Sequence, residues 1–207
     1  MIKRIATVKN SGKEEKRLAA MKKELALKKN ENMKTLSGWR YAHRGLHRKP
    51  EIPENSRAAF RRAAENGYGA ELDVHLLSDG TLAVFHDWDL KRMTGVAGTL
   101  EDCTREDLEK LFLGDTQETI PTLEEVLQIF GGCTPLIVEL KTWADNANAL
   151  TEAVCRVMDT YQGPYCIESF NPYPLAWLRD NRPDIVRGLL AQDFLKTTAG
   201  LDFLKAL

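Results

Sequence analysis

The fold is decided by a short stretch, AELDVHL at residues 70–76, which has the composition of a buried strand yet carries two acidic side chains. Glu71 and Asp73 are two positions apart, so in a strand both carboxylates lie on the same face, about 6–7 Å apart along the chain. Like charges at this spacing repel each other, and a hard cation such as Mg²⁺ or Ca²⁺ between them makes the pair favourable. The stretch therefore predicts a strand that carries part of a metal site.

Short apolar runs recur on both sides of this stretch and alternate with helix-forming segments. This pattern is typical of βα units around a parallel sheet, and it predicts an α/β fold. The expected strands lie near 40–44, 70–76, 82–86, 136–141, 165–170 and 186–191. The segment 87–121 fits no regular element.

Three helices are expected between these strands. Asn55 can cap the first, which carries Phe60, Ala63 and Ala64 on one face and ends at Gly67. In the second, Thr122 and Glu125 form a capping box before a helix through Phe130. The third covers 147–161, where apolar residues recur at helical spacing.

Ionisable side chains gather at the C-terminal ends of the expected strands. The first strand ends at His43 and Arg44, the third ends at His86, and the fourth places Glu139 and Lys141 on one face. α/β barrels and open α/β sheets build their active sites at this end of the strands. Three carboxylates can bind a hard metal ion, and two imidazoles can act in acid–base catalysis. The positively charged Arg44 and Lys141 can bind an anion. This set favours metal-assisted phosphoryl chemistry, and the lack of a GxGxxG or GxxxxGKS loop argues against nucleotide-driven transfer.

Eight short motifs, in this order, make the chain resemble the glycerophosphodiester phosphodiesterase family. They are HRG at 43–45, PEN at 53–55, ELDV at 71–74, DG at 79–80, HD at 86–87, IPTLEEV at 120–126, ELK at 139–141 and SFN at 169–171. The resemblance implies a TIM-type (β/α)₈ barrel. It also implies hydrolysis of glycerophosphodiesters to sn-glycerol 3-phosphate and an alcohol with a divalent cation, Ca²⁺ or Mg²⁺, as part of lipid and glycerol metabolism.

The resemblance also implies roles for nine residues. They are the metal ligands Glu71, Asp73 and Glu139, the acid–base pair His43 and His86, the phosphate-binding Arg44 and Lys141, and the supporting Glu54 and Asn55. The resemblance leaves open which alcohol is released, and whether water or the glycerol 2-hydroxyl attacks the phosphate first.

The charge distribution divides the chain into two parts. Residues 1–40 carry a net charge of +8 and residues 41–207 a net charge of −9. We expect a basic N-terminal helical extension over 1–38, helical from 13 to 29, and a barrel domain over 39–207. The acidic domain argues against a nucleic-acid partner, and no apolar run is long enough to span a membrane. Solvation of the basic helix is expected, and weak peripheral contact with anionic lipid is the alternative.

The barrel domain is shorter than the fold usually requires. A (β/α)₈ barrel takes about 250 residues, so 39–207 holds about six of the eight units, and the seventh and eighth strands have no candidates. We expect a barrel incomplete at its C-terminus, with an apolar tail over 194–207. Two alternatives stay open: a catalytically impaired relative that keeps the metal and phosphate site, and a lysophospholipase D-type phosphodiesterase.

The absence of a signal sequence and of CxxC pairs favours a cytoplasmic location for the protein.

Overall fold

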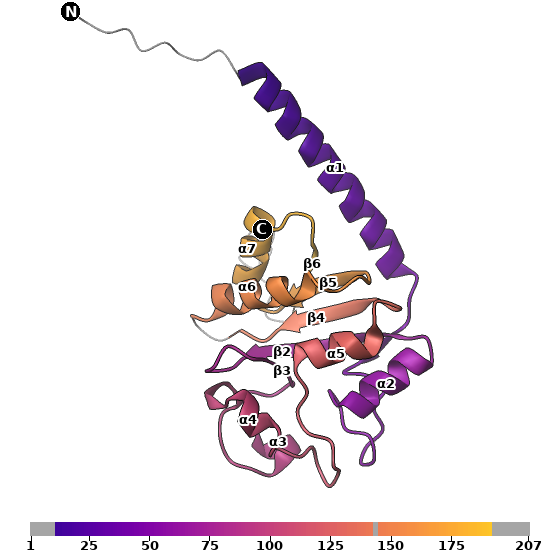
Figure 1. Cartoon of the computed structure of the whole chain (residues 1–207), viewed down its shortest axis with the longest axis vertical. Coiled ribbons are helices and arrows are strands. Elements are labelled where there is room, and N and C mark those ends of the chain that lie inside the picture. The colour runs from indigo at the N-terminus through magenta and orange to yellow at the C-terminus, as the bar shows by residue number, and fades with distance from the viewer. Residues whose placement is uncertain (1–10, 143–144, 192–207) are drawn as a thin grey trace, which may run out of the picture.

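The structure is a computed structural model of the 207-residue chain and describes residues 11–142 and 145–191. The apolar tail expected over 194–207 lies outside the described residues. In the described part, an α/β body of sheet and helices follows one long N-terminal helix, α1 (Ser11–Ser37), which stands out from it (Figure 1).

A six-stranded sheet forms the centre of the described body. Its strands are β1 (Tyr41–His43), β2 (Gly69–Leu76), β3 (Leu82–Val84), β4 (Leu136–Leu140), β5 (Tyr165–Ser169) and β6 (Val186–Leu189). All six strands expected from the sequence are present. The spatial order is β1-β2-β4-β5-β6, with every neighbouring pair parallel, and β3 pairs separately with β2. This is the strand arrangement of a partial (β/α) barrel.

The direction of β3 differs from the sequence expectation. β3 is antiparallel to β2, with Val74 opposite Val84, because a tight turn joins the two strands. Leu77 N–H donates to the carbonyl of Thr81 at 2.9 Å, and Gly80 takes the left-handed φ of 88°. So short a link permits a hairpin, whereas a parallel crossover needs a dozen or more residues. The sheet therefore holds five parallel strands, and the chain leaves β3 heading back along β2 toward β1.

Helices lie along one face of the sheet (Figure 1). These helices are α2 (Arg57–Glu65), α5 (Leu123–Phe130), α6 (Ala147–Met158) and α7 (Pro172–Asn181). Three short helices, α3 (Lys91–Thr94), η1 (Leu100–Asp102) and α4 (Arg105–Leu108), belong instead to the segment between β3 and α5. The capping box of α5 agrees with the prediction, and the helix ends at Gly131, which has a left-handed backbone. The cap of α2 does not, because Ser56 Oγ, one residue later than expected, accepts from Ala59 N–H.

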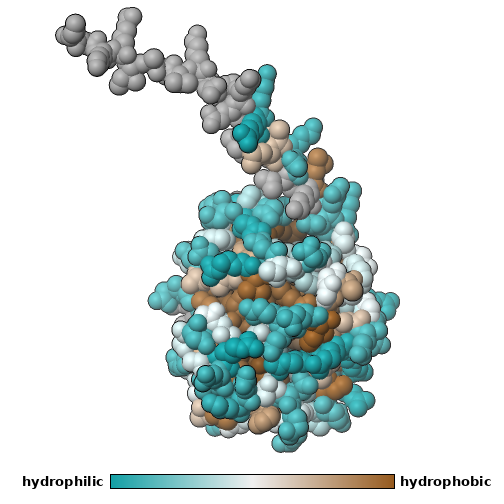
Figure 2. All heavy atoms as spheres, in the orientation of Figure 1, coloured by the Kyte–Doolittle hydropathy of each residue, from teal (hydrophilic) through white to brown (hydrophobic). Residues whose placement is uncertain are grey.

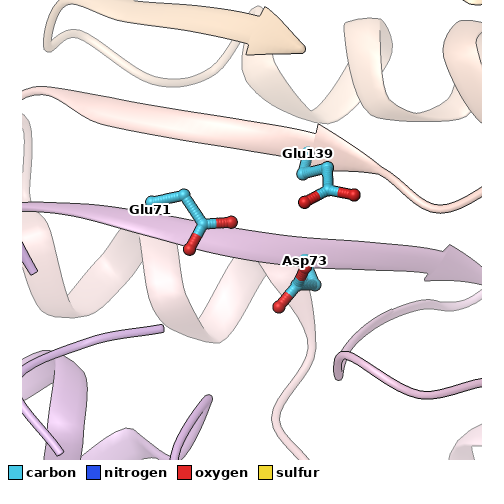
Figure 3. Close-up of side chains that lie close together, drawn as sticks. All are labelled: Glu71, Asp73 and Glu139. Carbon is cyan, nitrogen blue, oxygen red and sulfur yellow. The ribbon is translucent and has the colours of Figure 1, made fainter. Parts of the chain in front are cut away.

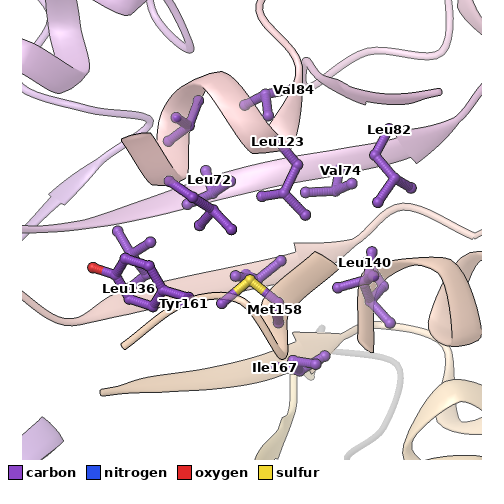
Figure 4. Packing of buried hydrophobic residues seen from close by; sticks show 14 of the residues in the cluster. Leu72, Val74, Leu82, Val84, Leu123, Leu136, Leu140, Met158, Tyr161 and Ile167 are labelled. Atoms are coloured by element: carbon purple, nitrogen blue, oxygen red, sulfur yellow. The ribbon is translucent and has the colours of Figure 1, made fainter. Parts of the chain in front are cut away.

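The main hydrophobic core fills the space between the sheet and these helices. Figure 4 shows the outward side chains of β2 and β4 meeting residues of the covering helices: Leu72, Val74, Leu136, Leu140, Leu123 and Met158. A second, smaller core lies under the segment that appeared irregular in sequence. Phe85, Leu100, Leu113 and Ile120 belong to it and are almost completely buried.

α1 contacts the body only near its C-terminal end. Leu36 is buried, and Tyr41 of β1 donates its phenolic hydrogen to the carbonyl of Leu36 at 2.8 Å. Helix α1 also packs against β5 and β6, and its Asn32 lines a hollow together with Tyr165. The described surface of α1 is mostly hydrophilic (Figure 2), and Leu27 is among its exposed apolar residues. No helix among the described residues combines the length and the apolar content that crossing a bilayer requires.

Candidate active site

Three carboxylates converge on the sheet face that the helices leave uncovered. Glu71 and Asp73 come from β2 and Glu139 from β4, and β-pairing places Asp73 directly opposite Glu139. One oxygen from each side chain lies within 4.8 Å of the others (Figure 3). All three residues are at most 7% exposed. The structure thus brings the expected acidic cluster together.

Burial and mutual repulsion disfavour the negative charge of these groups. The pKa of Glu71 is raised to about 8, first by burial and then by the charge of Asp73. Burial also raises the pKa of Glu139 above its ordinary value, despite a hydrogen bond from Lys141. Carboxylates held in this way gain from a bound cation that restores their charged state.

Two positively charged side chains partly offset the negative charge of the carboxylate cluster. Lys141 Nζ lies 2.9 Å from Asp73 Oδ1 and 2.6 Å from Glu139 Oε1. Arg44 Nε lies 3.4 Å from Asp73 Oδ2, and the Arg44 backbone N–H donates to Glu71 Oε2 at 3.0 Å. Burial lowers the affinity of the Lys141 amine for its proton, but Asp73 and Glu139 outweigh this and raise its pKa. Both predicted phosphate-binding residues therefore lie at the edge of the carboxylate cluster.

Two residues beside the cluster have left-handed backbone conformations. Arg44 has φ 56° and Asn55 has φ 54°, and Asn55 N–H donates to the Arg44 carbonyl at 2.9 Å. The Asn55 amide also donates to Asp73 Oδ2 at 2.8 Å, which holds that carboxylate in place. Gly45 follows with φ 78°, where a Cβ would lie 2.8 Å from the side chain of Ala59. Asn55 thus holds the side chain of Asp73 and does not cap α2.

The buried carboxylate of Glu54 is the centre of an ionic network. Its carboxylate contacts Lys49 at 2.6 Å, Arg44 at 2.8 Å and Arg92 at 2.7 Å. Burial alone would raise the pKa of Glu54, but the hydrogen bonds from Arg92, Lys49 and Arg44 outweigh it and hold the pKa well below its ordinary value. A carboxylate that stays charged here fixes the Arg44 guanidinium beside Asp73.

The two histidines flank the cluster from different elements. His43 ends β1, its side chain is 69% exposed, and its Nε2 lies 3.8 Å from Glu71 Oε2. Burial and the neighbouring Arg44 lower the pKa of His43. His86 follows β3, and its Nδ1 lies 2.7 Å from Asp87 Oδ1. The antiparallel course of β3 returns the chain toward β1, so His86 reaches the site by a different route from the one expected.

The donor set fits a hard divalent cation. Every candidate ligand is a carboxylate oxygen, and Oε1 of Glu71 is buried without a hydrogen bond among the described residues. An unpartnered buried oxygen costs free energy that coordination would recover. Carboxylate oxygens of this kind suit both Ca²⁺ and Mg²⁺.

Sequence reasoning assigned no role to three residues of this region. Asp87 accepts from Arg92 and contacts His86, so it links the histidine to the Glu54 network. Glu168 lies opposite Glu139 in the β4–β5 pairing, and burial followed by repulsion from Glu139 and Asp73 raises its pKa to about 7. The HD pair and the Glu two residues after Cys166 on the fifth strand were the available signals.

A cavity of about 690 Å³ adjoins the cluster on the side of His86. Its walls come from the ends of β4 and β5, from the segment after β3 and from η1. They include His86, Trp88, Glu101, Asp102, Glu139, Lys141 and Phe170. This volume is typical of small-molecule pockets, so the site has room for a substrate beside its charged groups.

Comparison with proteins of known sequence identifies close relatives. A glycerophosphodiester phosphodiesterase of Caldanaerobacter subterraneus is 37% identical over 170 residues, which is 77% of this chain and 68% of the relative. One from Bacillus altitudinis is 34% identical over 169 residues, or 75% and 67% of the two chains. The chain thus spans about two thirds of the length of these relatives.

Solved structures show the same architecture. A phosphodiesterase of Oleispira antarctica, in complex with the product sn-glycerol-3-phosphate, superposes with a TM-score of 0.72 at 28% identity over 81% of this chain and 71% of its own. A glycerophosphodiester phosphodiesterase of Thermotoga maritima gives a TM-score of 0.64 at 27% identity, over 80% and 68%. The family model for glycerophosphoryl diester phosphodiesterases matches residues 43–203. On this evidence the chain belongs to the glycerophosphoryl diester phosphodiesterase family.

Proposed function

We propose that this chain hydrolyses glycerophosphodiesters to sn-glycerol 3-phosphate and an alcohol, with Glu71, Asp73 and Glu139 holding a divalent cation. The convergence of these three buried carboxylates within 4.8 Å carries the proposal. The glycerol phosphate bound to the Oleispira antarctica relative supports the choice of product.

The cations of the site would receive the phosphate. Lys141 and Arg44 lie at the border of the acidic cluster, where their positive charges can bind phosphate oxygens next to the metal ligands. When bound, the divalent cation would withdraw electron density from the phosphate and promote ionisation of the attacking hydroxyl. Both residues are held by carboxylates, so the charges are already in position before substrate arrives.

The histidines would move the protons. One imidazole removes the proton of the attacking hydroxyl, and the other protonates the departing alkoxide. Asp87 contacts Nδ1 of His86, which leaves Nε2 of that ring to exchange a proton with the substrate. His43, on the other side of Glu71, is exposed enough to contact a bound ester.

An assay for glycerol phosphate tests the proposal. The chain, freed of metal by EDTA and reloaded separately with Ca²⁺ or Mg²⁺, is incubated with glycerophosphocholine, and sn-glycerol 3-phosphate is measured by an enzyme-coupled reaction. We expect activity with at least one metal and a loss of at least about 100-fold in Asp73→Asn. Glu152→Gln, which removes an exposed carboxylate of α6, is the matched control and should retain activity.

The same assay addresses the two alternatives. Folded, metal-loaded protein that forms no more product than Asp73→Asn would contradict hydrolysis and favour an impaired relative. Faster turnover of lysophosphatidylcholine than of its deacylated form would indicate a lysophospholipase D-type enzyme.

We also propose that the boundary between the N-terminal extension and the barrel domain lies between residues 38 and 39, and that the chain is located in the cytoplasm. The basic extension would make at most weak contact with anionic lipid, because the apolar residues Leu18, Met21 and Leu25 make only a narrow stripe in its sequence. Co-sedimentation with anionic vesicles, compared with neutral vesicles, measures this contact.

A further inference from the structure

The carboxylate of Asp87 lies between the His86 ring and the guanidinium of Arg92. Oδ1 of Asp87 lies 2.7 Å from His86 Nδ1 and accepts from Arg92 Nη2 at 3.0 Å, and Oδ2 accepts from Arg92 Nε. The guanidinium thus holds both oxygens of one carboxylate, which fixes the orientation of the pair as well as its distance. Asp87 directly follows His86 in the chain, and the backbone alone leaves both side chains several rotamers. Arg92 therefore decides how Asp87 faces the ring.

The same guanidinium also contacts the phosphate-binding side of the site. Arg92 Nη2 donates to Glu54 Oε1 at 2.7 Å, and Arg44 Nη1 donates to the same oxygen at 2.8 Å. An isolated ion pair of a side chain as exposed as Arg92, at 44%, would contribute little. Glu54, however, is only 5% exposed, so water competes little for these bonds. Arg92 thus connects His86 to Arg44 through two carboxylates.

The second, smaller core holds Arg92 in place. Arg92 lies on α3, and Leu90, directly before this helix, is 3% exposed and belongs to that core. Leu90 N–H donates to the Gly98 carbonyl at 3.0 Å, and Met93 packs against the same core. A helix of a single turn gains little stability from its own hydrogen bonds, so these contacts determine its position. The segment between β3 and α5 therefore supplies a restraint on His86.

The charges of these groups agree with this arrangement. Burial alone would raise the pKa of Asp87, but the hydrogen bonds from Arg92 and His86 outweigh it and lower the pKa. The hydrogen bonds to Asp87 and Glu54 raise the pKa of Arg92. Asp87 is therefore a carboxylate that only accepts, so the hydrogen between it and His86 must lie on Nδ1. The neutral ring then presents Nε2 without a hydrogen.

We infer that Arg92 is a positioning residue for the proposed reaction. By holding Asp87, Arg92 sets the tautomer and the orientation of the His86 ring. By sharing Glu54 with Arg44, it also fixes that ring relative to the phosphate-binding side chain. The effect on turnover rests on the proposed hydrolysis, whereas the tautomer can be measured without any substrate.

Nitrogen NMR of the imidazole rings measures the positioning directly. Correlations between the ring nitrogens and the non-exchanging ring hydrogens, recorded on the metal-free full chain at alkaline pH, report which nitrogen carries the hydrogen. The signals that vanish in His86→Gln identify this ring. In the parent the hydrogen should lie on Nδ1, and Arg92→Met should shift the population toward Nε2, because Asp87 loses its orientation. Lys91→Met, the same kind of change at the neighbouring exposed position, should leave the tautomer unchanged.

Kinetics with glycerophosphocholine measure the consequence for turnover. Arg92→Met should lower kcat about 10- to 100-fold, because a small misplacement of a reacting group has a large effect on rate. KM should change less, because Arg44 keeps its other carboxylate contact, to Asp73. The same substitution made in Asp87→Asn should lower kcat by less than about 3-fold, because the effect passes through Asp87. Arg92→Lys, which keeps the charge but cannot hold both oxygens, is the second variant should Arg92→Met melt at a lower temperature than the parent.

The two measurements separate this inference from the proposed hydrolysis. An unchanged His86 tautomer in folded Arg92→Met, or an equal loss of kcat in the parent and in Asp87→Asn, would overturn the inference and make Arg92 a structural residue only. A shifted tautomer in a protein that hydrolyses no ester would contradict the proposed hydrolysis and leave the positioning intact.

Discussion

The two faces of β2 contrast most sharply in this molecule. Leu72 and Val74 point toward the helices and are fully buried among apolar side chains, whereas Glu71 and Asp73, their immediate neighbours, are buried among charges on the other face. One strand thus contributes to stability through one set of residues and to chemistry through the other. The alternation of side chains along a strand allows both to coexist without a change in backbone.

The contrast shows where free energy is gained and where it is spent. The face of β2 that points toward the helices, the outer face, gains free energy because apolar surface is transferred out of water. The gain is about 1.5–3 kcal/mol for a fully buried aliphatic side chain. The opposite face, the inner face, which carries Glu71 and Asp73, loses free energy because like charges lie close together in a poorly hydrated space. The following three predictions test whether the two faces are separate in function as well as in position.

The largest effect is expected from the histidines beside the inner face. His43→Ala and His86→Ala should each lower kcat about 10²- to 10⁴-fold, because each removes a positioned proton-transfer group, while the melting temperature changes little. Steady-state kinetics and thermal melts followed by circular dichroism measure both quantities. A large fall in melting temperature with preserved specific activity would instead assign the histidine to the scaffold.

The second prediction concerns the outer face. Leu72→Ala should lower the free energy of unfolding by about 2–5 kcal/mol, because it opens a cavity in the main core, while kcat/KM per folded molecule stays near that of the parent. Urea denaturation and kinetics well below the melting temperature measure the two effects. Leu27→Ala, at an exposed position of α1, is the control and should change unfolding by less than about 0.5 kcal/mol.

The smallest change in stability is expected from the inner face, and its sign is opposite. Glu71→Gln should leave the metal-free protein as stable as the parent or up to about 1 kcal/mol more stable, because it removes an acid whose charged form is disfavoured by burial and by Asp73 and keeps an acceptor for the Arg44 N–H. Activity should be lost. Urea denaturation in EDTA, beside Glu152→Gln, measures the change. Destabilisation by more than about 2 kcal/mol would mean that the inner face also supports the fold.

Much of this arrangement could be predicted from the sequence, because it depends on local patterns. The six strands, the capping box of α5 and the shared face of Glu71 and Asp73 follow from spacing alone. The direction of β3 does not, because the side-chain pattern of a strand is the same in either direction. Direction is set by the length of the connection, and DG at 79–80 was the local signal for a hairpin.

The supporting network was less accessible to sequence reasoning. Arg92 contacts Glu54 across 38 positions of the chain, and its partner Asp87 binds His86, so only the fold brings these charges together. Helix α7 was expected only as one of the helices between strands, without bounds, although Asn171 caps it and Pro172 occupies its first turn. Long-range ion pairs leave no local pattern in the sequence, whereas a helix cap followed by proline is such a pattern.

The left-handed backbone of Arg44 bears on how this protein would evolve under selection for heat resistance. Glycine adopts φ 56° freely, whereas a residue with a Cβ loses about 1–2 kcal/mol there. Glycine here would also remove the guanidinium from the buried carboxylates of Glu54 and Asp73, and the loss of one partner of a buried ion pair costs about 3–5 kcal/mol. A library screened only for thermal survival is therefore expected to retain arginine at position 44, because the buried ion pairs outweigh the strain of the backbone.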